Sequence, residues 1–369
     1  MKIIFQDFKR KYKKYKQDIL KTTKRIFEGG YFILGPELEK FEKNFAKFIG
    51  SKYAVGVNSG TDAIYLALRA LDIGRGDEVI TSSHTATATV SAIRMSGAMP
   101  VFVDIEPEHL TINPDLIEQK ITAKTRCIIP VHIYGYPAML DKIFSIAKKH
   151  KLIVIEDSCQ AHGAEYRGRK VGSMGDVGCF SFYPTKNLGG FGDGGAVVTN
   201  SKEIADKVKA LRNYGEISKY NNLTEGVNTR LDELQAGFLN LGLNKLSEWN
   251  KKRNKLALSY VKQLKGLPIV LSPIGNSKEK RVWHLFVIRT AQRDALKEFL
   301  AKKGIATMIH YPIPVFAQNA YKFLGYKDKD LPITAKTAKE ILSLPLYPEL
   351  KMEEVSIIVR GIRSFFNAQ

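Results

Sequence analysis

The sequence has few cysteines and lacks the long apolar runs of membrane proteins. Its 369 residues include only Cys127, Cys159 and Cys179, with no C-x-x-C pair among them. Because this odd, scattered set suits neither a disulfide framework nor a zinc ribbon, we expect a protein of a reducing compartment without a metal site. No apolar run reaches the ~20 residues of a membrane helix. The start, MKIIFQDFKRKYKKYKQ, has no apolar signal core, so we expect a cytoplasmic protein.

Acidic residues are scarce relative to basic ones. The chain carries 57 Lys and Arg against 37 Asp and Glu, which gives a formal net charge of +20. Such a charge suits a nucleic acid, an anionic membrane or an acidic small molecule. The lysines are spread along the whole chain, and no zinc finger, RNP motif or arginine-rich segment accompanies them. We therefore expect no nucleic-acid or membrane partner, although the positive field would help to capture a substrate that carries phosphates.

Apolar, strand-like runs alternate with helical patterns over the first 200 residues. The expected strands cover residues 53–57, 77–83, 99–105, 126–135, 152–156, 179–183 and 195–200. Helical patterns such as DKIFSIAKKHK (141–151) separate several of these runs. This alternation predicts an α/β fold, in which helices cover both faces of a mostly parallel sheet.

The two ends of the chain differ from this middle part. At the start, apolar residues recur in steps of three and four at Phe5, Phe8, Tyr12, Tyr15 and Ile19. They mark one face of a helix, which we expect to dock on the protein itself rather than on a membrane surface.

After about residue 245 the pattern becomes that of a smaller α+β unit. It consists of a polar helix (246–264), a strand (281–289), a helix (294–304), the loop HYPIP (310–314) and a terminal helix. We expect a large α/β domain over 1–245, with a helical arm at 1–30, and a small C-terminal domain over 246–369.

Ligands of open α/β sheets bind at the carboxyl ends of the strands, and two of these ends carry polar residues. Asn58-Ser59-Gly60-Thr61 joins a strand to a helix, where free N–H groups suit a phosphate. An ordinary helix cap by Ser59 or Thr61 is the alternative.

Asp157 follows the buried run LIVIE, so it needs a partner such as a helix cap or a cationic nitrogen of a cofactor. Gln160 and His162 could face the same crevice, although a lone histidine such as His162 is more typical of a structural role.

The stretch FSFYPTKNLGGFGDGGAV (180–197) is a third strand end. Its glycines match the spacing G-x-G-x-x-G, but they precede a strand rather than a helix, so a dinucleotide site is disfavoured and a tight turn is favoured. Lys186 sits between an apolar strand and this turn. An ordinary surface lysine is the alternative, but such a residue would not need to lie between an apolar strand and a tight turn. Held in a crevice, its amine would have a lowered pKa and would attack carbonyl groups.

Together these residues match the needs of pyridoxal 5'-phosphate. That cofactor requires a phosphate cradle, a carboxylate for its ring nitrogen and a lysine for a Schiff base. Gly60 and Thr61 would provide the cradle, to which Ser181 adds a hydroxyl, while Asp157 and Lys186 supply the other two groups.

From about Gly30 onward the sequence resembles the DegT/StrS family of pyridoxal-phosphate-dependent nucleotide-sugar aminotransferases. The resemblance is carried by GYFILGPELEKFE, NSGTDAIYLAL, IPVHIYG, IEDSCQAHGA, FSFYPTKNLGGFGDGGAV and NTRLDELQAG. It implies a fold-type I transferase that forms a homodimer with active sites at the subunit interface.

The resemblance also implies roles for single residues. Lys186 matches the Schiff-base lysine, Asp157 the partner of the pyridine nitrogen and Gln160 the residue beside the ring hydroxyl. Phosphate binders are matched by Ser59, Gly60, Thr61 and Ser181, and by Asn228 reaching across from the other subunit.

SFYPTKNLG, WHLFVIR and HYPIP resemble the subgroup that aminates carbon 3 of a dTDP-linked 3-keto-6-deoxyhexose, with L-glutamate as donor. Tyr183, His310 and Tyr311 would line its sugar site, and the product would serve deoxyamino-sugar biosynthesis such as that of lipopolysaccharide O-antigens. For Tyr183 a core position in the strand is the alternative, and for His310 and Tyr311 an ordinary interdomain loop.

Three other functions are alternatives to this one. A carbon-4 aminotransferase acting on a UDP-, GDP- or dTDP-4-keto sugar is the main alternative. Sugar dehydratases of the same fold carry histidine at the position of Lys186, and a regulatory nucleic-acid-binding protein would not need this lysine, aspartate and cradle.

One position departs from the family. Where many relatives place an aromatic residue over the cofactor ring, this sequence has Ala86; His84 is a candidate substitute or an ordinary loop histidine.

Overall fold

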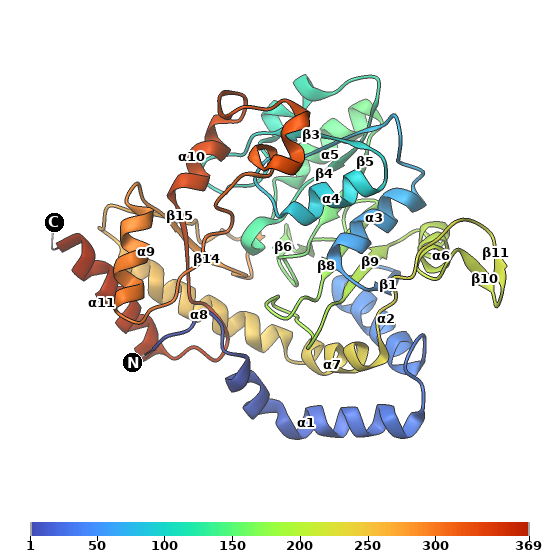
Figure 1. Cartoon of the computed structure of the whole chain (residues 1–369), viewed down its shortest axis with the longest axis horizontal. Helices are drawn as coiled ribbons and strands as arrows, with labels where there is room; N and C mark the ends of the chain where they lie inside the picture. Colours follow the sequence, from blue (N-terminus) through green and yellow to red (C-terminus); the bar gives the residue numbers. More distant parts are fainter. Residues whose placement is uncertain (1, 368–369) are drawn as a thin grey trace.

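A seven-stranded mixed sheet forms the centre of the molecule. The computed structural model describes residues 2–367. The strands are β1 (Tyr53–Val57), β2 (Glu78–Ser82), β3 (Met99–Val103), β4 (Thr125–Ile129), β5 (Ile153–Asp157), β8 (Val177–Ser181) and β9 (Gly195–Thr199). Their order is β1-β9-β8-β5-β4-β2-β3, and only β9 runs antiparallel to its neighbours (Figure 1). The expected mixed, mostly parallel sheet is confirmed.

Helices cover both faces of this sheet, as the alternating sequence predicts. One face packs on α3 (Gly60–Ala70), α4 (Thr87–Met95) and α6 (Lys202–Leu211). The other packs on α2 (Pro36–Ile49), α5 (Leu140–His150) and α7 (Glu233–Leu243). Neighbouring strand residues alternate between the two cores; Cys127 and Ile129 point to one face and Ile128 to the other. The strands are therefore apolar throughout, which explains why they read as continuous runs.

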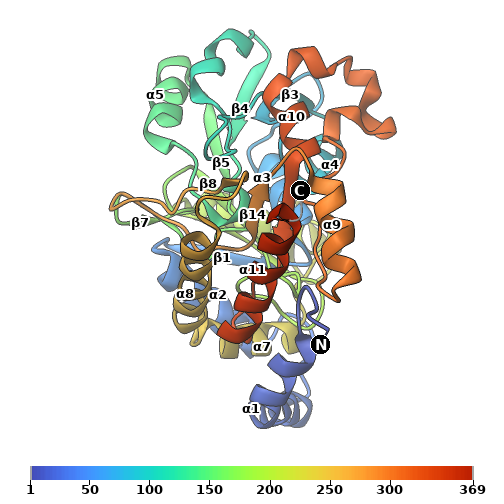
Figure 2. The same cartoon turned by 90° about the vertical axis from the view of Figure 1, so that its left-hand side faces the viewer.

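The chain after residue 245 forms a second, antiparallel sheet with its own helices. The order is β12-β14-β15, and α8, α9 and α11 accompany it (Figures 1 and 2). The bounds are α8 (Leu246–Leu264), β12 (Val270–Leu271), β14 (Phe286–Arg289), α9 (Arg293–Lys302), α10 (Pro332–Glu340), β15 (Ile341–Leu344) and α11 (Met352–Asn367). One apolar cluster joins all of these elements except α10 and also includes Ile3. We propose that residues 246–369 form the small domain.

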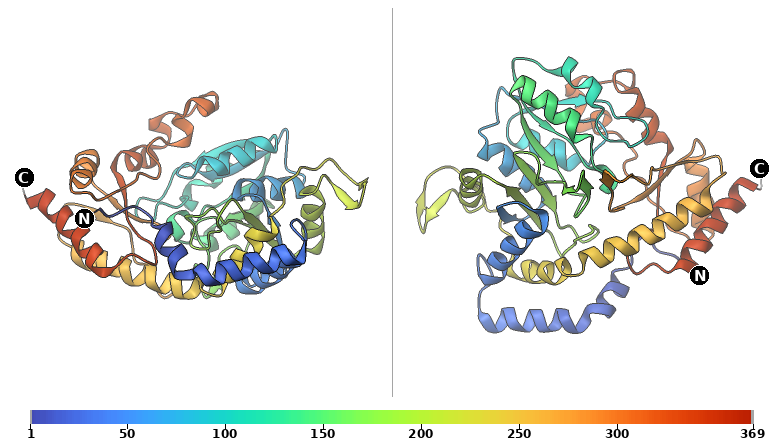
Figure 3. Two further views of the ribbon diagram at one scale, coloured as in Figure 1. Left: turned by 60° about the horizontal axis from the view of Figure 1, so that its bottom comes forward. Right: turned by 180° about the vertical axis from the view of Figure 1, so that it is seen from behind.

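Shorter strands complete the structure. They are β6 (Glu165–Tyr166), β7 (Arg169–Lys170), β10 (Glu216–Ser218), β11 (Asn221–Asn222) and β13 (Glu279–Lys280). The β10–β11 hairpin projects at the end of the molecule opposite α9 and α11 (Figure 3). Among residues 2–367, no helix is both long and apolar enough to cross a membrane.

The N-terminal helix docks on the protein, and it buries the second half of the expected face. Helix α1 (Phe8–Gly29) lies along α7 (Figure 1) and buries Tyr15, Ile19, Thr22 and Ile26. Phe5 precedes the helix, and Phe8 and Tyr12 are 39% and 42% exposed. The helix is kinked at Tyr15, whose backbone is not helical (φ −112°, ψ 16°), so the residues before the kink point differently from those after it.

Two expected strands are shorter in the structure. Strand β4 ends at Ile129 and β14 begins only at Phe286. Trp283 has a left-handed backbone (φ 50°), which interrupts a strand, and the N–H groups of Val282 and His284 donate to Gly135 and Tyr134 instead of to a ladder. These two shortened ends thus contact each other.

Candidate active site

Three strand ends meet at one edge of the central sheet. The carboxyl ends of β1, β5 and β8 point the same way, since β1 and β8 both run antiparallel to the intervening β9. A Cβ atom added to Gly60, which follows β1, would lie 2.7 Å from the Cβ of Ser181 and 2.8 Å from the Sγ of Cys159. The structure therefore brings the start of α3 against the ends of β5 and β8.

The start of α3 is capped and still has free N–H groups. The Ser59 hydroxyl accepts a hydrogen bond from the N–H of Asp62 (3.1 Å) and donates to the carboxylate of Asp62 (2.9 Å), so Ser59 is an N-cap. The N–H groups of Gly60 and Thr61 have no intrahelical acceptor, because they belong to the first turn. The two interpretations of this turn are thus compatible: Ser59 caps the helix, and the next two N–H groups are available to an anion.

Asp157 is a buried carboxylate at the end of β5. It is 5% exposed, and its oxygens accept hydrogen bonds from the Thr89 hydroxyl (2.8 Å) and the Cys159 N–H (3.2 Å). No Lys, Arg or His of residues 2–367 lies within ion-pair distance of it. A buried, negatively charged group without a cationic partner fits a protonated ring nitrogen of a ligand. Thr89 was not predicted from the sequence, because only the fold brings α4 to β5.

Lys186 lies just after β8 in a tight turn. Its N–H donates to the carbonyl of Tyr183 (2.8 Å), and the N–H of Gly190 donates back to Phe182 (2.8 Å). The glycines of this stretch lead into β9, so the tight turn is confirmed and the dinucleotide site is not formed. Burial lowers the pKa of the Lys186 amine, and the nearby Cys159 and Asp157 oppose that shift. The residue as a whole is only partly buried.

Gln160 joins this edge to the loop at residues 310–314. Its side-chain oxygen accepts a hydrogen bond from the N–H of Tyr134 (2.8 Å), and its amide nitrogen donates to the hydroxyl of Tyr311 (3.3 Å). The neighbouring His310 pairs through Nδ1 with the Ser343 hydroxyl (2.9 Å). Burial, together with the charge of Lys186, lowers the pKa of His310 to about 4, so it is neutral at physiological pH. Two of the expected sugar-site residues thus lie beside Gln160.

The two histidines considered for the crevice are both buried. His162 packs against Phe180 and Phe182, with ring centroids 5.5 and 5.8 Å apart, which places it in the aromatic core below the site. His84 contacts the hydroxyl of Tyr134 through Nε2 (2.6 Å). Ala86 is the N-cap of α4 and brings no ring to this edge.

Tyr183 and Asn228 point away from the body of the chain. Tyr183 is 52% exposed, so it is not the core residue of a strand. Asn228 is also exposed, on the segment that follows β11. A single chain therefore presents both residues to solvent or to another molecule.

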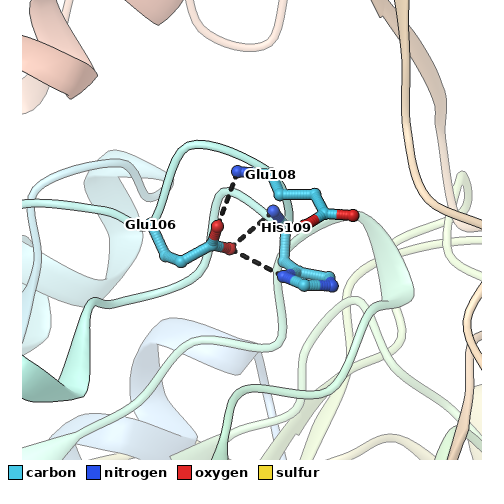
Figure 4. Close-up of side chains that lie close together, drawn as sticks. All are labelled: Glu106, Glu108 and His109. Atoms are coloured by element: carbon cyan, nitrogen blue, oxygen red, sulfur yellow. Dashed lines mark hydrogen bonds and ion pairs between the residues drawn. The ribbon is translucent and has the colours of Figure 1, made fainter.

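One group of side chains has the spacing of metal ligands. The ligand atoms of Glu106, Glu108 and His109 lie within 4.8 Å of one another (Figure 4). The Glu106 carboxylate already accepts hydrogen bonds from the N–H groups of Glu108 and His109 and pairs with Nδ1 of His109, each at 2.7 Å. These bonds explain the arrangement as a turn, and we assign no metal to it.

The sheet and the residues at its edge define a class of protein. A lysine in the turn between a parallel and an antiparallel strand, opposite a buried aspartate and a free helix start, is the arrangement of fold-type I transferases that use pyridoxal phosphate. The residues fit the group: the lack of a side chain at Gly60 lets the free N–H groups of α3 approach Ser181, and Asp157 lacks a cation.

Comparison with known proteins gives the family. The sequence pattern of the DegT/DnrJ/EryC1/StrS aminotransferase family matches residues 13–363. The chain belongs to this family, so the expected fold, the aminotransferase activity and its dependence on pyridoxal phosphate are confirmed.

Similar proteins include two that act on sugar nucleotides. The dTDP-3-amino-3,4,6-trideoxy-alpha-D-glucose transaminase of Streptomyces venezuelae is 44% identical over 99% of this chain and 96% of its own. The dTDP-3-amino-3,6-dideoxy-alpha-D-galactopyranose transaminase of Aneurinibacillus thermoaerophilus is 44% identical over 98% of this chain and 99% of its own. The crystal structure of Streptomyces venezuelae DesV in complex with a ketimine intermediate superposes with a TM-score of 0.97 at 45% identity, covering 99% of this chain and 98% of that chain.

Proposed function

We propose that this protein transfers an amino group from L-glutamate to the 3-keto group of a dTDP-linked 6-deoxy sugar. The observation that carries the proposal is the pair formed by a lysine with a lowered pKa and a buried, cation-free aspartate at one sheet edge. The two relatives described above are named as 3-amino-sugar transaminases, and each is similar to this chain over nearly its whole length. Their names support a sugar nucleotide as substrate and carbon 3 as the reacting position.

The residues divide the work of holding the cofactor. Asp157 would keep the ring nitrogen protonated, the start of α3 and Ser181 would bind the phosphate, and Gln160 would lie beside the ring hydroxyl. When bound, the cofactor supplies an electron-withdrawing ring that stabilises charge on the reacting carbon. The Lys186 amine, whose pKa is lowered by burial, would accept and return the proton of that carbon.

The sugar would lie between the loop at residues 310–314 and the turn that carries Tyr183. Tyr311 is fixed by Gln160, and Tyr183 is exposed beside Lys186, so both hydroxyls can reach a substrate that enters from solvent. The neutral His310 would complete this wall.

The active protein would be a homodimer whose sites include Asn228 of the second subunit. Large apolar side chains are exposed at the end of α1 and just after it, and on and next to the hairpin, a feature of interaction surfaces. They are Phe27, Tyr31, Phe32, Ile33 and Leu34, and Ile217, Tyr220 and Leu223. The hairpin leads directly to Asn228, so covering it with a second copy would bring Asn228 to that copy.

Mixing two inactive variants tests this sharing. Lys186→Ala and Asn228→Ala subunits, unfolded and refolded together, would form hybrids with one intact site, and random pairing restores about a quarter of the wild-type sites. No recovery on mixing would contradict a shared site.

We also propose that the protein works in the cytoplasm and supplies deoxyamino sugars. All three cysteines lie within the described residues and are free thiols, as expected in a reducing compartment.

The decisive experiment for the function is a substrate panel. The purified protein is incubated with pyridoxal phosphate, L-glutamate and 3-keto or 4-keto sugars linked to dTDP, UDP or GDP, and products are analysed by mass spectrometry and NMR. We expect amination at carbon 3 of a dTDP sugar. An amine at carbon 4 would favour the alternative activity, and no amine with any sugar would contradict the proposal.

A further inference from the structure

Tyr134 occupies an unusual place between β4 and α5. It is buried, and its backbone is left-handed (φ 56°), a conformation that residues other than glycine rarely adopt. Residues held in this way are fixed by their surroundings rather than by local preference. The contacts of Tyr134 show what it is fixed to.

Three segments that are distant in sequence meet at this residue. Its N–H donates to the side-chain oxygen of Gln160 (2.8 Å). Its hydroxyl donates to the backbone carbonyl of His310 and pairs with Nε2 of His84 (2.6 Å). Since the one hydroxyl proton goes to His310, the hydroxyl must accept from His84, which sets the proton of His84 on Nε2.

Burial keeps this cluster neutral and dry. It lowers the pKa of His84 to about 4 and raises the pKa of the Tyr134 hydroxyl well above its ordinary value. Hydrogen bonds without competing water hold their geometry closely.

The contact with Gln160 also determines which way its amide points. Because the Tyr134 N–H requires an acceptor, the amide oxygen faces Tyr134 and the amide N–H groups face Tyr311. A donor is therefore presented to the site.

We propose that Tyr134 is a positioning residue that sets the geometry of the keto-sugar site. Its hydroxyl ties the loop at residues 310–314 to the segment before α4, and its N–H orients Gln160 beneath Tyr311. This inference rests on the proposed function, in which that loop lines the sugar.

The test replaces the hydroxyl alone. Tyr134→Phe keeps the ring and the N–H, and the matched control is Tyr136→Phe, whose hydroxyl two residues away donates to Glu279 (2.7 Å). In Tyr134→Phe we expect the KM for the keto-sugar nucleotide to rise about 10-fold, the effect of about one hydrogen bond. The KM for L-glutamate and the affinity for pyridoxal phosphate should change less than about twofold, as should every constant of the control.

Amide hydrogen exchange gives a second readout that needs no substrate. In Tyr134→Phe the backbone amides of residues 308–311 and of Ile313 should exchange faster than in the wild type, while those of β14 should not change. Equal losses for both substrates, or unchanged exchange at residues 308–311 and Ile313, would overturn the inference. If the wild-type protein aminates no keto sugar, the proposed function fails, and the exchange measurement still decides whether Tyr134 holds the loop.

Discussion

At the scale of single residues, the chemistry depends on an amine whose pKa is lowered by its surroundings. Burial lowers the pKa of Lys186, whereas an exposed lysine keeps a pKa of about 10.4. Lys186→Ala should abolish the yellow colour of the cofactor-loaded protein and lower kcat by at least ~10²–10⁴-fold, since it removes the general base. Lys202→Ala, on the surface beside Asp206, is the control and should keep both. Borohydride reduction followed by peptide mapping identifies the attached residue, and label at any other lysine would refute the assignment.

A second residue-scale effect concerns stability in acid. His162 is buried, and neither ring nitrogen has a hydrogen-bond partner within residues 2–367. Burial and the charge of Lys186 lower its pKa to about 3. Between pH 6.5 and 3 the unfolded chain binds a proton that the folded chain does not, so the free energy of unfolding falls as the pH falls.

His162→Leu removes this titration. Between pH 7.5 and pH 5 the wild type should lose about 2 kcal/mol more stability than the variant. Urea unfolding followed by tryptophan fluorescence measures the difference. Equal losses in the wild type and His162→Leu would show that His162 is not buried in its neutral form.

The sequence predicts the chemically special residues of this site but not their supports. Lys186 and Asp157 stand at the ends of apolar strands, where the rule for α/β sheets directs attention. Thr89 and Tyr134 have no such mark, because their partners, Asp157 and His310, come from other parts of the chain. Hydrogen bonds between distant segments depend on tertiary structure, which no local pattern encodes.

At the scale of elements, the close approach of α3 to β8 needs a glycine. A Cβ atom at residue 60 would lie within 3 Å of Ser181 and Cys159. Gly60→Ala should therefore lower stability by about 1–3 kcal/mol through overpacking and weaken cofactor binding by displacing the helix start. Gly29→Ala, where nothing lies within 4 Å of the added atom, is the matched control. Thermal unfolding and cofactor titration measure both effects, and unchanged affinity in Gly60→Ala would contradict the cradle.

Errors in the expected elements share one cause. The helix at the N-terminus is kinked at Tyr15, and the strand expected at 281–289 is interrupted at Trp283, where the backbone is left-handed. The periodicity of apolar residues identifies one face of an element but does not locate a kink in it. The Arg281 guanidinium, for example, stacks on the Trp283 ring with its Cζ 3.6 Å from the ring centroid, a contact that only the folded chain shows. The types of both elements were nevertheless predicted correctly.

At the scale of the whole molecule, the first and last helices are joined by an ion pair. Arg10 contacts both carboxylate oxygens of Glu354 (2.7 and 2.8 Å), and Glu354 is 1% exposed. The hydrogen bond from Arg10 is the main reason that the pKa of Glu354 lies below its usual value in the folded protein. The stability that this ion pair contributes is therefore lost as the pH falls from the usual pKa of a glutamate through the lowered pKa of Glu354.

Arg10→Met should lower the free energy of unfolding by about 2 kcal/mol, because it leaves a buried carboxylate without its cation. Arg25→Met, which breaks an exposed pair with Glu37, should cost less than about 1 kcal/mol. A double-mutant cycle with Glu354→Gln, measured by urea unfolding, isolates the pair. A coupling near zero would mean that the arm is held by its apolar face alone.

The contact of Ile3 with the small domain has a consequence for how the protein is made. Ile3 is synthesised before the apolar residues of its cluster, which lie between residues 256 and 365. Its side chain therefore has no partners from this cluster until those later segments have been made, so this contact forms late in folding.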